Sequence, residues 1–245
     1  MQIRLNKFLA QAGVASRREV DKMIAEGRIK VNGQVVQVLG YKIDDEKDRV
    51  EVEGRRVERE EGLVYLMINK PPGYLVTLKD NFQRPTIQQL LPSLRQRVFP
   101  VGRLDYDSSG LLLMMNDGEL AFRLTHPRFK VPKVYLVKVK GEPDPSELTR
   151  LEKGIYLDDK KTAPAKIAQI GGDPKKSLLK IEIYEGRKRE VKRMFRAIGY
   201  KVLQLQRINF GGLRLGSLKM GKWRFLTRKE IDSLKKQVAP KQMEN

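Results

Sequence analysis

Two carboxylates and an arginine stand close together in residues 99–118, FPVGRLDYDSSGLLLMMNDG. Arg103, Asp105 and Asp107 occupy alternate positions, and the apolar run that follows them predicts a buried strand. A carboxylate in a turn next to such a strand can lie at the rim of a cleft, where it can serve as a nucleophile or as a base. The alternative is an ordinary polar turn that is capped by its Asp and Ser side chains. Spacing alone does not decide between the two.

A second charged segment, RKREVKRMFR, spans residues 187–196. Its cations are Arg187, Lys188, Arg189, Lys192, Arg193 and Arg196, and Glu190 is its single acid. Apolar residues at helical spacing, among them Val191, Met194 and Phe195, can form the inner face of a helix. The segment therefore predicts a docked helix whose cations contact phosphate groups, because a merely solvated face fits poorly with so one-sided a charge balance.

The whole chain is strongly basic. It has 245 residues, and its 50 Lys and Arg against 30 Asp and Glu give a formal net charge of +20. An excess of this size indicates RNA or DNA as the partner, with a generic basic surface as the alternative. Hydrophobic residues make up 40% of the chain, which is enough to build the cores of two domains.

Scarce and missing residue types exclude several kinds of chemistry. The chain has no cysteine and one histidine, His126, which excludes disulfides and both Cys-based and multi-His metal sites. His126 precedes a proline, which is typical of a turn residue. The nucleotide-binding loops GxGxxG and GxxxxGKS do not occur, so we expect no nucleotide cofactor. Without a signal peptide or an apolar run near the ~20 residues of a membrane span, we expect a cytoplasmic protein with no membrane contact.

The first 61 residues predict a small module of two helices and a hairpin. Apolar residues at helical spacing predict a first helix over residues 3–11, and Ser16 with Glu19 forms a capping-box pattern that starts a second one. Asn32-Gly33 is a strong hairpin-turn signal. The cations of this module are Arg4, Lys7, Arg17, Arg18, Lys22, Arg28 and Lys30. As a set they can follow a phosphate backbone, although each of them alone also fits a solvated helix face.

The rest of the chain mixes strands with helices. Strands are predicted over residues 63–70, 111–116, 133–141, 166–170 and 177–186. Helices are predicted over residues 85–97, 117–125, 145–152, 187–198 and 227–236. Because these elements lack a regular βαβ order, they indicate an α+β fold with a mainly antiparallel mixed sheet. We expect a small domain with its linker over residues 1–61, a larger domain over 62–236 and a disordered tail over 237–245.

Several separate motifs resemble those of the pseudouridine synthases of the RsuA/RluB group, which act on bacterial ribosomal RNA. The segment GRLDYDSSGLLLMMNDGELAFRLTHP resembles the catalytic motif of that group, and NKPPG (69–73) resembles the strand-ending motif before it. KVYLVKVKG resembles the strand that carries a tyrosine, EGRKREVKRMFRAIGYKVLQLQRINFGGL resembles the basic helix with its following strand, and GKWRFLT resembles the closing segment. At the N-terminus, RLNKFLAQAGVASRREVDKMIAEGRIKVNGQVV resembles an S4 RNA-binding domain. The resemblance covers nearly the whole chain, in the order of the group.

This resemblance implies roles for four residues. Asp105 corresponds to the essential aspartate, and Lys192 corresponds to the basic residue that pairs with it. Tyr135 corresponds to the tyrosine that stacks on the target base, and Arg103 to the arginine that fills the space left by the flipped nucleotide. We expect RNA to be bound by Arg103, Arg4, Lys7, Arg17, Arg18, Arg28, Arg187, Arg189 and Arg193. Ser108-Ser109 stands where many members have Thr-Ser, a mild departure that puts no catalytic residue in doubt.

The implied reaction detaches uracil from ribose, turns it and rejoins it through carbon. It involves neither redox change nor phosphate transfer, and the resemblance implies no metal and no cofactor. HPRFKVPKVYLVKVKG and GIYLDDKKTAPAKI resemble the large-subunit branch more than the small-subunit branch. We therefore expect a monomer that acts on 23S ribosomal RNA, free or in a precursor particle, with a 16S enzyme as the alternative.

Two other classes of function compete with this interpretation. One is a non-catalytic RNA-binding or ribosome-assembly factor with the same fold, against which Asp105, Tyr135 and Lys192 argue because all three are present. The other is a phosphotransferase, because Asp105-Tyr106-Asp107 resembles the DxD motif of haloacid-dehalogenase-type enzymes. That motif should end an apolar strand near the N-terminus of a parallel α/β domain, and the sequence pattern around Asp105 is different.

Overall fold

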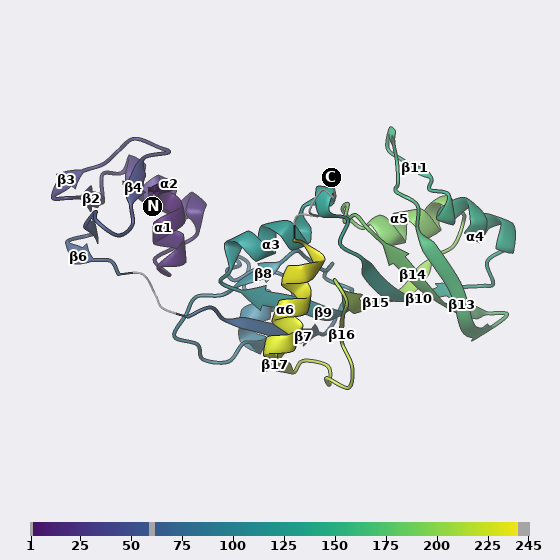
Figure 1. Ribbon diagram of the computed structural model, residues 1–245. Helices are drawn as coiled ribbons and strands as arrows, with labels where there is room; N and C mark the ends of the chain where they lie inside the picture. Colours follow the sequence, from purple (N-terminus) through teal and green to yellow (C-terminus); the bar gives the residue numbers. More distant parts are fainter. Residues whose placement is uncertain (1, 59–61, 240–245) are drawn as a thin grey trace. The chain divides into compact units, whose positions relative to one another are not determined.

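The structure, a computed structural model, describes residues 2–58 and 62–239 (Figure 1). The chain forms two units. The first comprises the residues up to Leu63 together with Leu94–Arg97, and the second comprises Val64–Ser93 and the chain from Val98 on. The predicted domain boundary near Glu61 lies outside the described residues.

The first unit contains two short helices followed by short antiparallel strands. The helices are α1 (Leu5–Gln11) and α2 (Arg17–Ala25). Strands β2 (Ile29–Val31), β3 (Gln34–Val35), β5 (Val50–Val52) and β6 (Arg55–Arg56) form a sheet in the order β3-β2-β5-β6. Leu5, Leu9, Val20, Ile24 and Ile29 are fully buried in its core. The apolar faces of the helices and strands therefore meet as the sequence pattern predicts.

Two local predictions for this unit are confirmed and one is wrong. Ser16 Oγ accepts a hydrogen bond from the Glu19 N–H at 3.2 Å, and the positive φ angles of Asn32 and Gly33 form the β2–β3 turn. The first helix, however, begins at Leu5 and not at residue 3. Residues 2–4 form strand β1 (Gln2–Arg4), which pairs with β4 (Lys42–Asp44), so a partner distant in the sequence overrides the local helical pattern.

A nine-stranded mixed sheet is the centre of the second unit. Its strands are β7 (Tyr65–Lys70), β8 (Phe99–Val101), β9 (Ser109–Met115), β10 (Lys133–Lys140), β13 (Lys166–Asp173), β14 (Lys176–Ile183), β15 (Val202–Phe210), β16 (Leu213–Arg214) and β17 (Trp223–Phe225). The main order is β13-β14-β10-β15-β9-β7-β17, with β16 on β15 and β8 on β9. Every pair is antiparallel except β15 with β9. The predicted α+β fold with a mainly antiparallel sheet is confirmed.

Helices cover the two halves of this sheet. Helices α3 (Gly118–Thr125) and α6 (Arg228–Gln237) lie over β7 and β9, and Leu111 and Leu113 share one core with Leu124 and Leu234 (Figure 1). Helix α5 (Glu190–Ala197) contacts β15, and α4 (Pro145–Glu152) contacts β13. In the ranges 2–58 and 62–239, no helix has both the length and the apolar character needed to cross a membrane.

The predicted helices 85–97 and 187–198 need correction. Residues 85–97 contain only the 3₁₀ helix η1 (Ile87–Leu90), because Leu91 is extended before Pro92 and a proline cannot continue the helix. Helix α5 begins at Glu190 and not at residue 187, since Arg189 adopts a left-handed conformation with φ of 53°. The turn before α5 thereby separates Arg187 and Lys188 from the cations of the helix.

The predicted C-terminal tail begins too early in the sequence. Helix α6 extends to Gln237, and Val238 is buried in the same core as Leu234. Residues 240–245 of that tail lie outside the described residues. The capping box of Thr227 and Glu230 at the start of α6 is confirmed.

Candidate active site

A cavity of about 370 Å³ is lined by one face of β10 and β15 and by two loops. Its floor is made by Lys133, Tyr135, Ile183, Leu205, Arg207 and Phe210. Tyr135 and Arg207 are cross-strand partners, so their side chains share a face of the sheet. The walls are residues 102–108 before β9 and residues 186–191 at the start of α5. The two charged segments identified in the sequence therefore meet at one cavity.

Asp105 lines the cavity, and Lys192 lies beside it. Lys192 Nζ is 3.6 Å from Asp105 Oδ2 and 2.5 Å from Asp107 Oδ1. The Lys192 side chain is 12% exposed, compared with 26% for Asp105 and 54% for Asp107. The ammonium is thus largely removed from water and is shared by two carboxylates. The expected contact between Asp105 and Lys192 is present, but the hydrogen bond of Lys192 goes to Asp107.

Two cations of the α5 region hold Asp107 in its charged form. Partial burial opposes ionisation, but the hydrogen bond and the charge of Lys192 outweigh it and lower the pKa of Asp107 below its ordinary value. Arg189 Nη2 adds a second positive charge at 3.6 Å from Asp107 Oδ2. The loop that carries Asp105 is therefore linked to α5 through ion pairs.

The same loop is hydrogen-bonded to Lys70, the last residue of β7. The fully buried ammonium of Lys70 donates to the backbone carbonyls of Pro71 at 2.8 Å, Tyr106 at 3.3 Å and Ser108 at 2.8 Å. Burial lowers the pKa of Lys70 to about 8, although the charges of Asp107 and Asp105 oppose this shift. Lys70 joins the turn after β7 to the turn before β9 and so fixes the position of Asp105.

Arg207 supplies a buried positive charge on the floor of the cavity. Its side chain is among the largest fully buried ones, and its Nε donates to the Leu111 carbonyl at 2.7 Å. The guanidinium carbon lies 4.8 Å from the centroid of the Phe210 ring. Within the described residues, Arg207 Nη2 has no hydrogen-bond partner. A buried donor without a partner is costly, and it is commonly explained by a functional role or by a bound group.

Lys133 is the second buried cation on the floor. Its Nζ donates to the Val131 carbonyl at 3.0 Å and lies 5.5 Å from the centroid of the Phe210 ring. Burial, together with the nearby charge of Arg207, lowers the pKa of Lys133 to about 8. Two cations flank one aromatic ring, which gives the floor a positive potential suited to an anionic ligand or to one rich in carbonyl oxygens.

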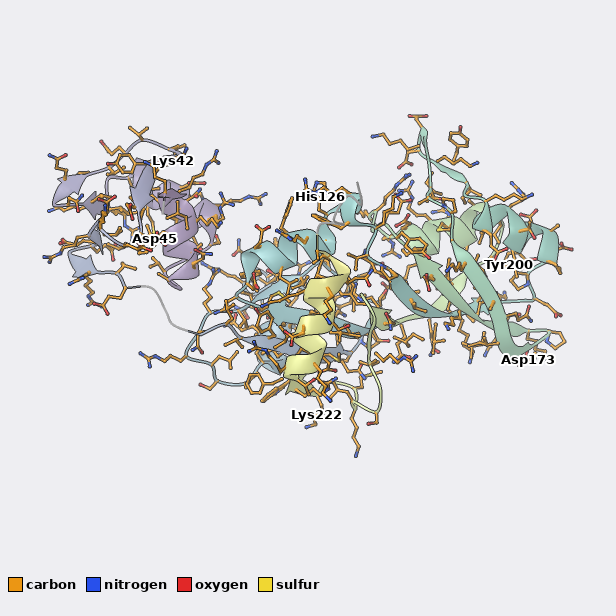
Figure 2. All side chains as sticks on the ribbon, viewed as in Figure 1. Lys42, Asp45, His126, Asp173, Tyr200 and Lys222 are labelled. Carbon is orange, nitrogen blue, oxygen red and sulfur yellow. The ribbon has the colours of Figure 1, made fainter. Side chains whose placement is uncertain are left out.

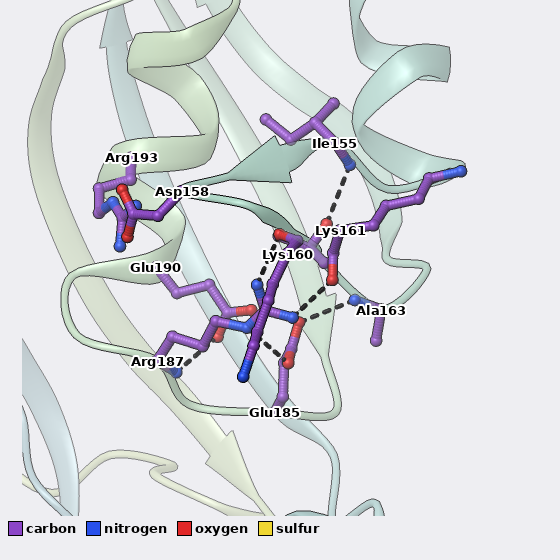
Figure 3. A network of polar contacts seen from close by, with 10 residues as sticks. Ile155, Asp158, Lys160, Lys161, Ala163, Glu185, Arg187, Glu190 and Arg193 are labelled. Carbon is purple, nitrogen blue, oxygen red and sulfur yellow. Dashed lines mark hydrogen bonds and ion pairs between the residues drawn. The ribbon is translucent and has the colours of Figure 1, made fainter.

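A network of polar contacts around Glu185, Arg187 and Glu190 supports the wall made by residues 186–191 (Figure 3). Burial, together with a hydrogen bond to Glu185, raises the pKa of Glu190 to about 8. Burial also opposes the charge of Glu185, but hydrogen bonds from Glu190 and from the Ala163 N–H help to lower the pKa of Glu185. A neutral Glu190 that donates to an ionised Glu185 accounts for both directions.

Arg187 belongs to this network and not to an open basic surface. Its guanidinium donates to the Lys160 carbonyl at 2.9 Å, to the Lys161 carbonyl at 2.5 Å and to Glu185 Oε2 at 3.0 Å (Figure 3). Lys160 and Lys161 form β12, which pairs with β11 (Tyr156–Leu157). Arg187 therefore fastens this hairpin to the wall of the cavity, and RNA binding by Arg187 stays a prediction.

The other predicted RNA-binding residues have different surroundings. Arg103 is exposed and lines the cavity. Arg189 is half-exposed beside Asp107, whereas Arg193 pairs with Asp158 at 2.6 Å. In the first unit, Arg4, Arg17 and Arg18 are exposed, Lys7 is partly buried, and Arg28 forms ion pairs with Glu26 and Glu53. RNA contact by each of these residues stays a prediction.

His126 is a turn residue, as expected from the proline that follows it. It lies at the surface between α3 and the 3₁₀ helix η2 (Pro127–Phe129), where its Nδ1 accepts a hydrogen bond from the Arg128 N–H (Figure 2). The residues that line the cavity do not include His126.

Sequence patterns did not single out four buried charged residues at this site. Lys70, Lys133, Glu190 and Arg207 are all at most 8% exposed. Lys70 is the last residue of β7, Lys133 is the first residue of β10, and Arg207 lies within β15. A cation at the end of a mostly apolar strand is the signal that could have identified Lys70 and Lys133, because Lys and Arg are rarely buried without partners. Glu190 gives no comparable signal, because the sequence around it is uniformly charged.

Together these features define the class of the protein. A partly buried carboxylate, a cation beside it and an aromatic ring share one cavity with a positive floor, on an α+β unit that follows a basic helical module. Such a cavity can admit a flat polar base and place a carboxylate next to the sugar that carries it. The arrangement is that of an enzyme that acts on a nucleotide of RNA.

Comparison with known proteins gives the family. Residues 64–197 match the family described as RNA pseudouridylate synthase, and residues 3–50 match the S4 domain. An uncharacterized RNA pseudouridine synthase of Aquifex aeolicus is 48% identical, with 98% of this chain and 97% of that protein covered. Ribosomal large subunit pseudouridine synthase B of Bacillus subtilis is 46% identical, with 95% of each chain covered. A crystal structure of a pseudouridylate synthase has a TM-score of 0.68 at 34% identity and covers 95% of this chain and 99% of its own.

The chain belongs to the RNA pseudouridylate synthase family, as its resemblance to the RsuA/RluB group predicted. It is an enzyme that isomerises uridine to pseudouridine in RNA, and its N-terminal module is an S4 RNA-binding domain.

Proposed function

We propose that this enzyme isomerises one uridine of 23S ribosomal RNA and that Asp105 is its catalytic carboxylate. The observation that carries the proposal is the position of Asp105 in the wall of the cavity, next to Lys192 and with Tyr135 on the same floor. The choice of RNA is supported by the large-subunit enzymes of Bacillus subtilis and Pseudomonas aeruginosa, which are 46% and 42% identical to the chain. The enzyme acts as a monomer in this proposal.

The target base must leave its helix before it can reach Asp105. Flipping a base out of a stack costs a few kcal/mol, which contacts in the cavity must offset. Tyr135 is 8% exposed on the cavity floor and offers a flat ring on which the uracil stacks. Arg103 is exposed at the rim and occupies the space that the base leaves, where its positive charge also faces the phosphates.

The carboxylate of Asp105 can serve in either of two ways. It can form a covalent bond as the bond between uracil and ribose breaks, and it is then released when the uracil rejoins through carbon. It can instead remove a proton from the ribose while the uracil is detached, and return that proton at the end. On either route the uracil carbon that joins the ribose then loses its proton, and the ring nitrogen that was released from the ribose gains one. Both routes use the carboxylate as an anion, and the ammonium of Lys192 lies 3.6 Å from Asp105 Oδ2.

The floor of the cavity completes the proposed mechanism. While the uracil is detached from ribose, it carries negative charge on its ring and its carbonyl oxygens. Arg207 and Lys133 are buried cations beneath this position, so they stabilise that charge without needing water to reorganise. The unpaired donor of Arg207 is available to a uracil oxygen after a small movement of its side chain.

The test uses in vitro transcribed 23S and 16S ribosomal RNA as substrates, with pseudouridine mapped at nucleotide resolution. We expect one modified position in 23S RNA with the native enzyme and no product with Asp105→Asn. Asp105→Asn should still bind the RNA, because the substitution preserves shape and removes only the charge. Undiminished product with a correctly folded Asp105→Asn enzyme would contradict the role of Asp105.

The same assay distinguishes the remaining alternatives. Modification of 16S RNA alone would replace the proposed substrate and leave the role of Asp105 standing. Binding without any product, on free RNA as well as on precursor particles from cells that lack the enzyme, would contradict the proposed substrate altogether. Sedimentation of the native enzyme with and without RNA tests the monomer.

A further inference from the structure

A short loop between β7 and β8 presents one aromatic ring to solvent. In residues 77–84, Asp80 Oδ2 accepts hydrogen bonds from the N–H groups of Phe82 and Arg84, each at 3.0 Å. Arg84 Nη2 lies 2.6 Å from Asp80 Oδ1, and its guanidinium carbon lies 5.0 Å from the centroid of the Phe82 ring. Phe82 is 77% exposed, the largest exposure of any large hydrophobic residue described.

These contacts hold the ring in place without burying it. Asp80 is tied to the loop by its two backbone hydrogen bonds and by Arg84, and the Arg84 hydrogen bond lowers the pKa of Asp80 to about 2. At neutral pH Asp80 is therefore ionised and pairs with Arg84. A ring that is already held in place loses little conformational freedom when a ligand stacks on it, so the loop is suited to binding.

The base of this loop lines a second cavity next to the catalytic one. This cavity has a volume of about 410 Å³, and Lys79, Asp80 and Arg84 of the loop line it, whereas the Phe82 ring lies outside the lining, between these residues in the sequence. Arg103, Leu104, Asp105, Lys188 and Arg189 line both cavities. A nucleotide in the second cavity would therefore lie next to one whose base is in the first, with Asp105 between them.

We propose that this second cavity holds the nucleotide that flanks the target uridine and that Phe82 stacks on the base of that nucleotide. The proposal rests on the proposed function, because it needs a target base in the catalytic cavity. Phe82 then helps to determine which RNA site is modified, because it selects uridines that have an unpaired base beside them. Stacking tolerates every base, so the selection is for an unpaired flank and not for its identity.

Charge favours RNA over a protein partner at this surface. Lys79, Arg84, Arg103, Lys188 and Arg189 line the cavity, whereas Asp80 and Asp105 are its only acids in the described lining. Asp80 is already neutralised by Arg84, so the net potential attracts phosphate. An exposed ring beside cations is the combination that single-stranded RNA surfaces use, because bases stack on the ring while phosphates contact the cations.

The experiment measures RNA affinity and single-turnover pseudouridine formation for Phe82→Ala and Phe82→Trp. The probe is a 23S fragment that contains the mapped uridine. We expect Phe82→Ala to weaken binding about 5- to 150-fold, as the loss of one base–aromatic stack does. Phe82→Trp should bind at least as well as the native enzyme, since it keeps a ring. Both variants should keep the native Tm, because the ring is outside the core.

Abasic RNA shows whether the ring contacts the flanking base. The fragment is made with an abasic residue on the 5′ side or on the 3′ side of the uridine. On one of these two RNAs, native enzyme and Phe82→Ala should bind equally, because the base that the ring contacts is gone. An undiminished effect of Phe82→Ala on both abasic RNAs, or no effect of it on the intact RNA, would overturn the proposal.

Phe122→Ala is the matched control. Phe122 is 44% exposed and has the Arg128 guanidinium carbon 5.4 Å from its ring centroid, but neither Phe122 nor any other residue of α3 lines the second cavity. Its loss should leave affinity within about twofold of the native value, as for a surface substitution without a specific contact. Failure of the proposed function is seen separately, since the native enzyme would then form no pseudouridine in 23S RNA at all.

Discussion

The ammonium of Lys192 lies between two carboxylates, and its side chain is largely shielded from water. A cation in this place offsets the repulsion between the two carboxylates and connects both of them to α5. Asp107 provides the closer contact, so it orients Lys192 while Asp105 stays free on its cavity side. Asp105 and Asp107 are alike in the sequence, but they have different roles: Asp107 orients Lys192, and Asp105 faces the cavity. The spacing of the two residues does not reveal this difference.

Replacement of Lys192 by methionine should lower kcat at least tenfold at neutral pH. It removes the positive charge 3.6 Å from Asp105 and the hydrogen bond to Asp107, so the loop that carries Asp105 loses its contacts with α5, and a displaced catalytic group loses a factor of ten or more in rate. Single-turnover rates measure this loss. Lys192→Arg keeps the charge and should recover most of the rate, whereas native turnover in Lys192→Met would contradict the pairing.

Glu190 gives a prediction for stability. In the folded enzyme its carboxyl keeps its proton up to about pH 8, whereas in the unfolded chain it loses the proton near its ordinary pKa of 4.5. Stability from this group is therefore complete below pH 4.5 and is lost as pH rises to about 8. The lowered pKa of Glu185 has the opposite effect on stability: its contribution is complete above its ordinary pKa of 4.5 and is lost as pH falls below that value.

Glu190→Gln should remove this loss of stability. Glutamine keeps a donor toward Glu185 but has no proton to lose. The free energy of unfolding of the variant, relative to that of the native enzyme, should therefore rise by on the order of 2–4 kcal/mol between pH 5 and pH 8. Urea unfolding of both proteins at the two pH values measures this change. Groups that titrate alike in both proteins contribute equally to each, so they cancel from the difference in the free energy of unfolding. A constant difference in the free energy of unfolding would show that Glu190 is ionised in the folded state.

At the scale of elements, the close approach of β9 and β15 decides where the cavity lies. This is the one parallel pair of the sheet, and it places Arg207 beside Gly110. Gly110 has φ of +105°, and a Cβ on it would lie 2.2 Å from the Arg207 carbonyl oxygen. Residues other than glycine rarely adopt this φ, and position 110 has no room for a Cβ. Glycine is therefore needed here for two reasons.

Gly110→Ala should destabilise the enzyme by roughly 3 kcal/mol or more, because the new methyl group forces the two strands apart. It should also lower activity, since β9 follows the loop of Asp105 and β15 carries Arg207. Thermal and urea unfolding measure the first effect. Gly171→Ala in the edge strand β13 is the control: that position has no left-handed φ and nothing within 4 Å, so we expect less than about 1 kcal/mol there.

At the scale of the whole molecule, charge is distributed over both units. The S4 domain exposes Arg4, Arg17 and Arg18, and the catalytic unit exposes Arg103 and Lys188 beside its cavities. A net charge of +20 on 245 residues makes counterion release a large part of RNA affinity. We therefore expect both units to contact phosphates of the RNA.

RNA affinity should fall steeply with salt, by about 0.7–0.9 log units per log unit of salt for each phosphate contacted. Arg18→Ala should reduce the magnitude of this slope by about 1 if Arg18 contacts a phosphate. Binding titrations from 50 to about 300 mM salt give the slopes. Arg150→Ala is the control, because Arg150 is exposed but already paired with Glu147 at 2.7 Å. A slope near zero for the native enzyme would contradict phosphate binding by both units.

The sequence by itself determined the fold class, most of the elements and the residues around Asp105. Local patterns suffice where neighbours in the chain decide the conformation, as in the Ser16 and Thr227 caps and the Asn32-Gly33 turn. Motif resemblance identified the family and is the source of the roles proposed for Asp105, Tyr135 and Lys192, because motifs record chemistry that periodicity does not encode. The helix expected over residues 85–97 failed because Pro92 outweighs apolar spacing.

Only the tertiary structure decided what each charged residue does. Arg187 and Lys192 stand five positions apart in one basic run, yet Arg187 holds a hairpin and Lys192 serves the carboxylates. Burial of Lys70 and Arg207, and the cavity beside the Phe82 loop, likewise arise where strands and loops distant in sequence meet. Charge and hydrogen bonding act through distance in space and exclusion of water, and neither quantity can be read from the order of residues.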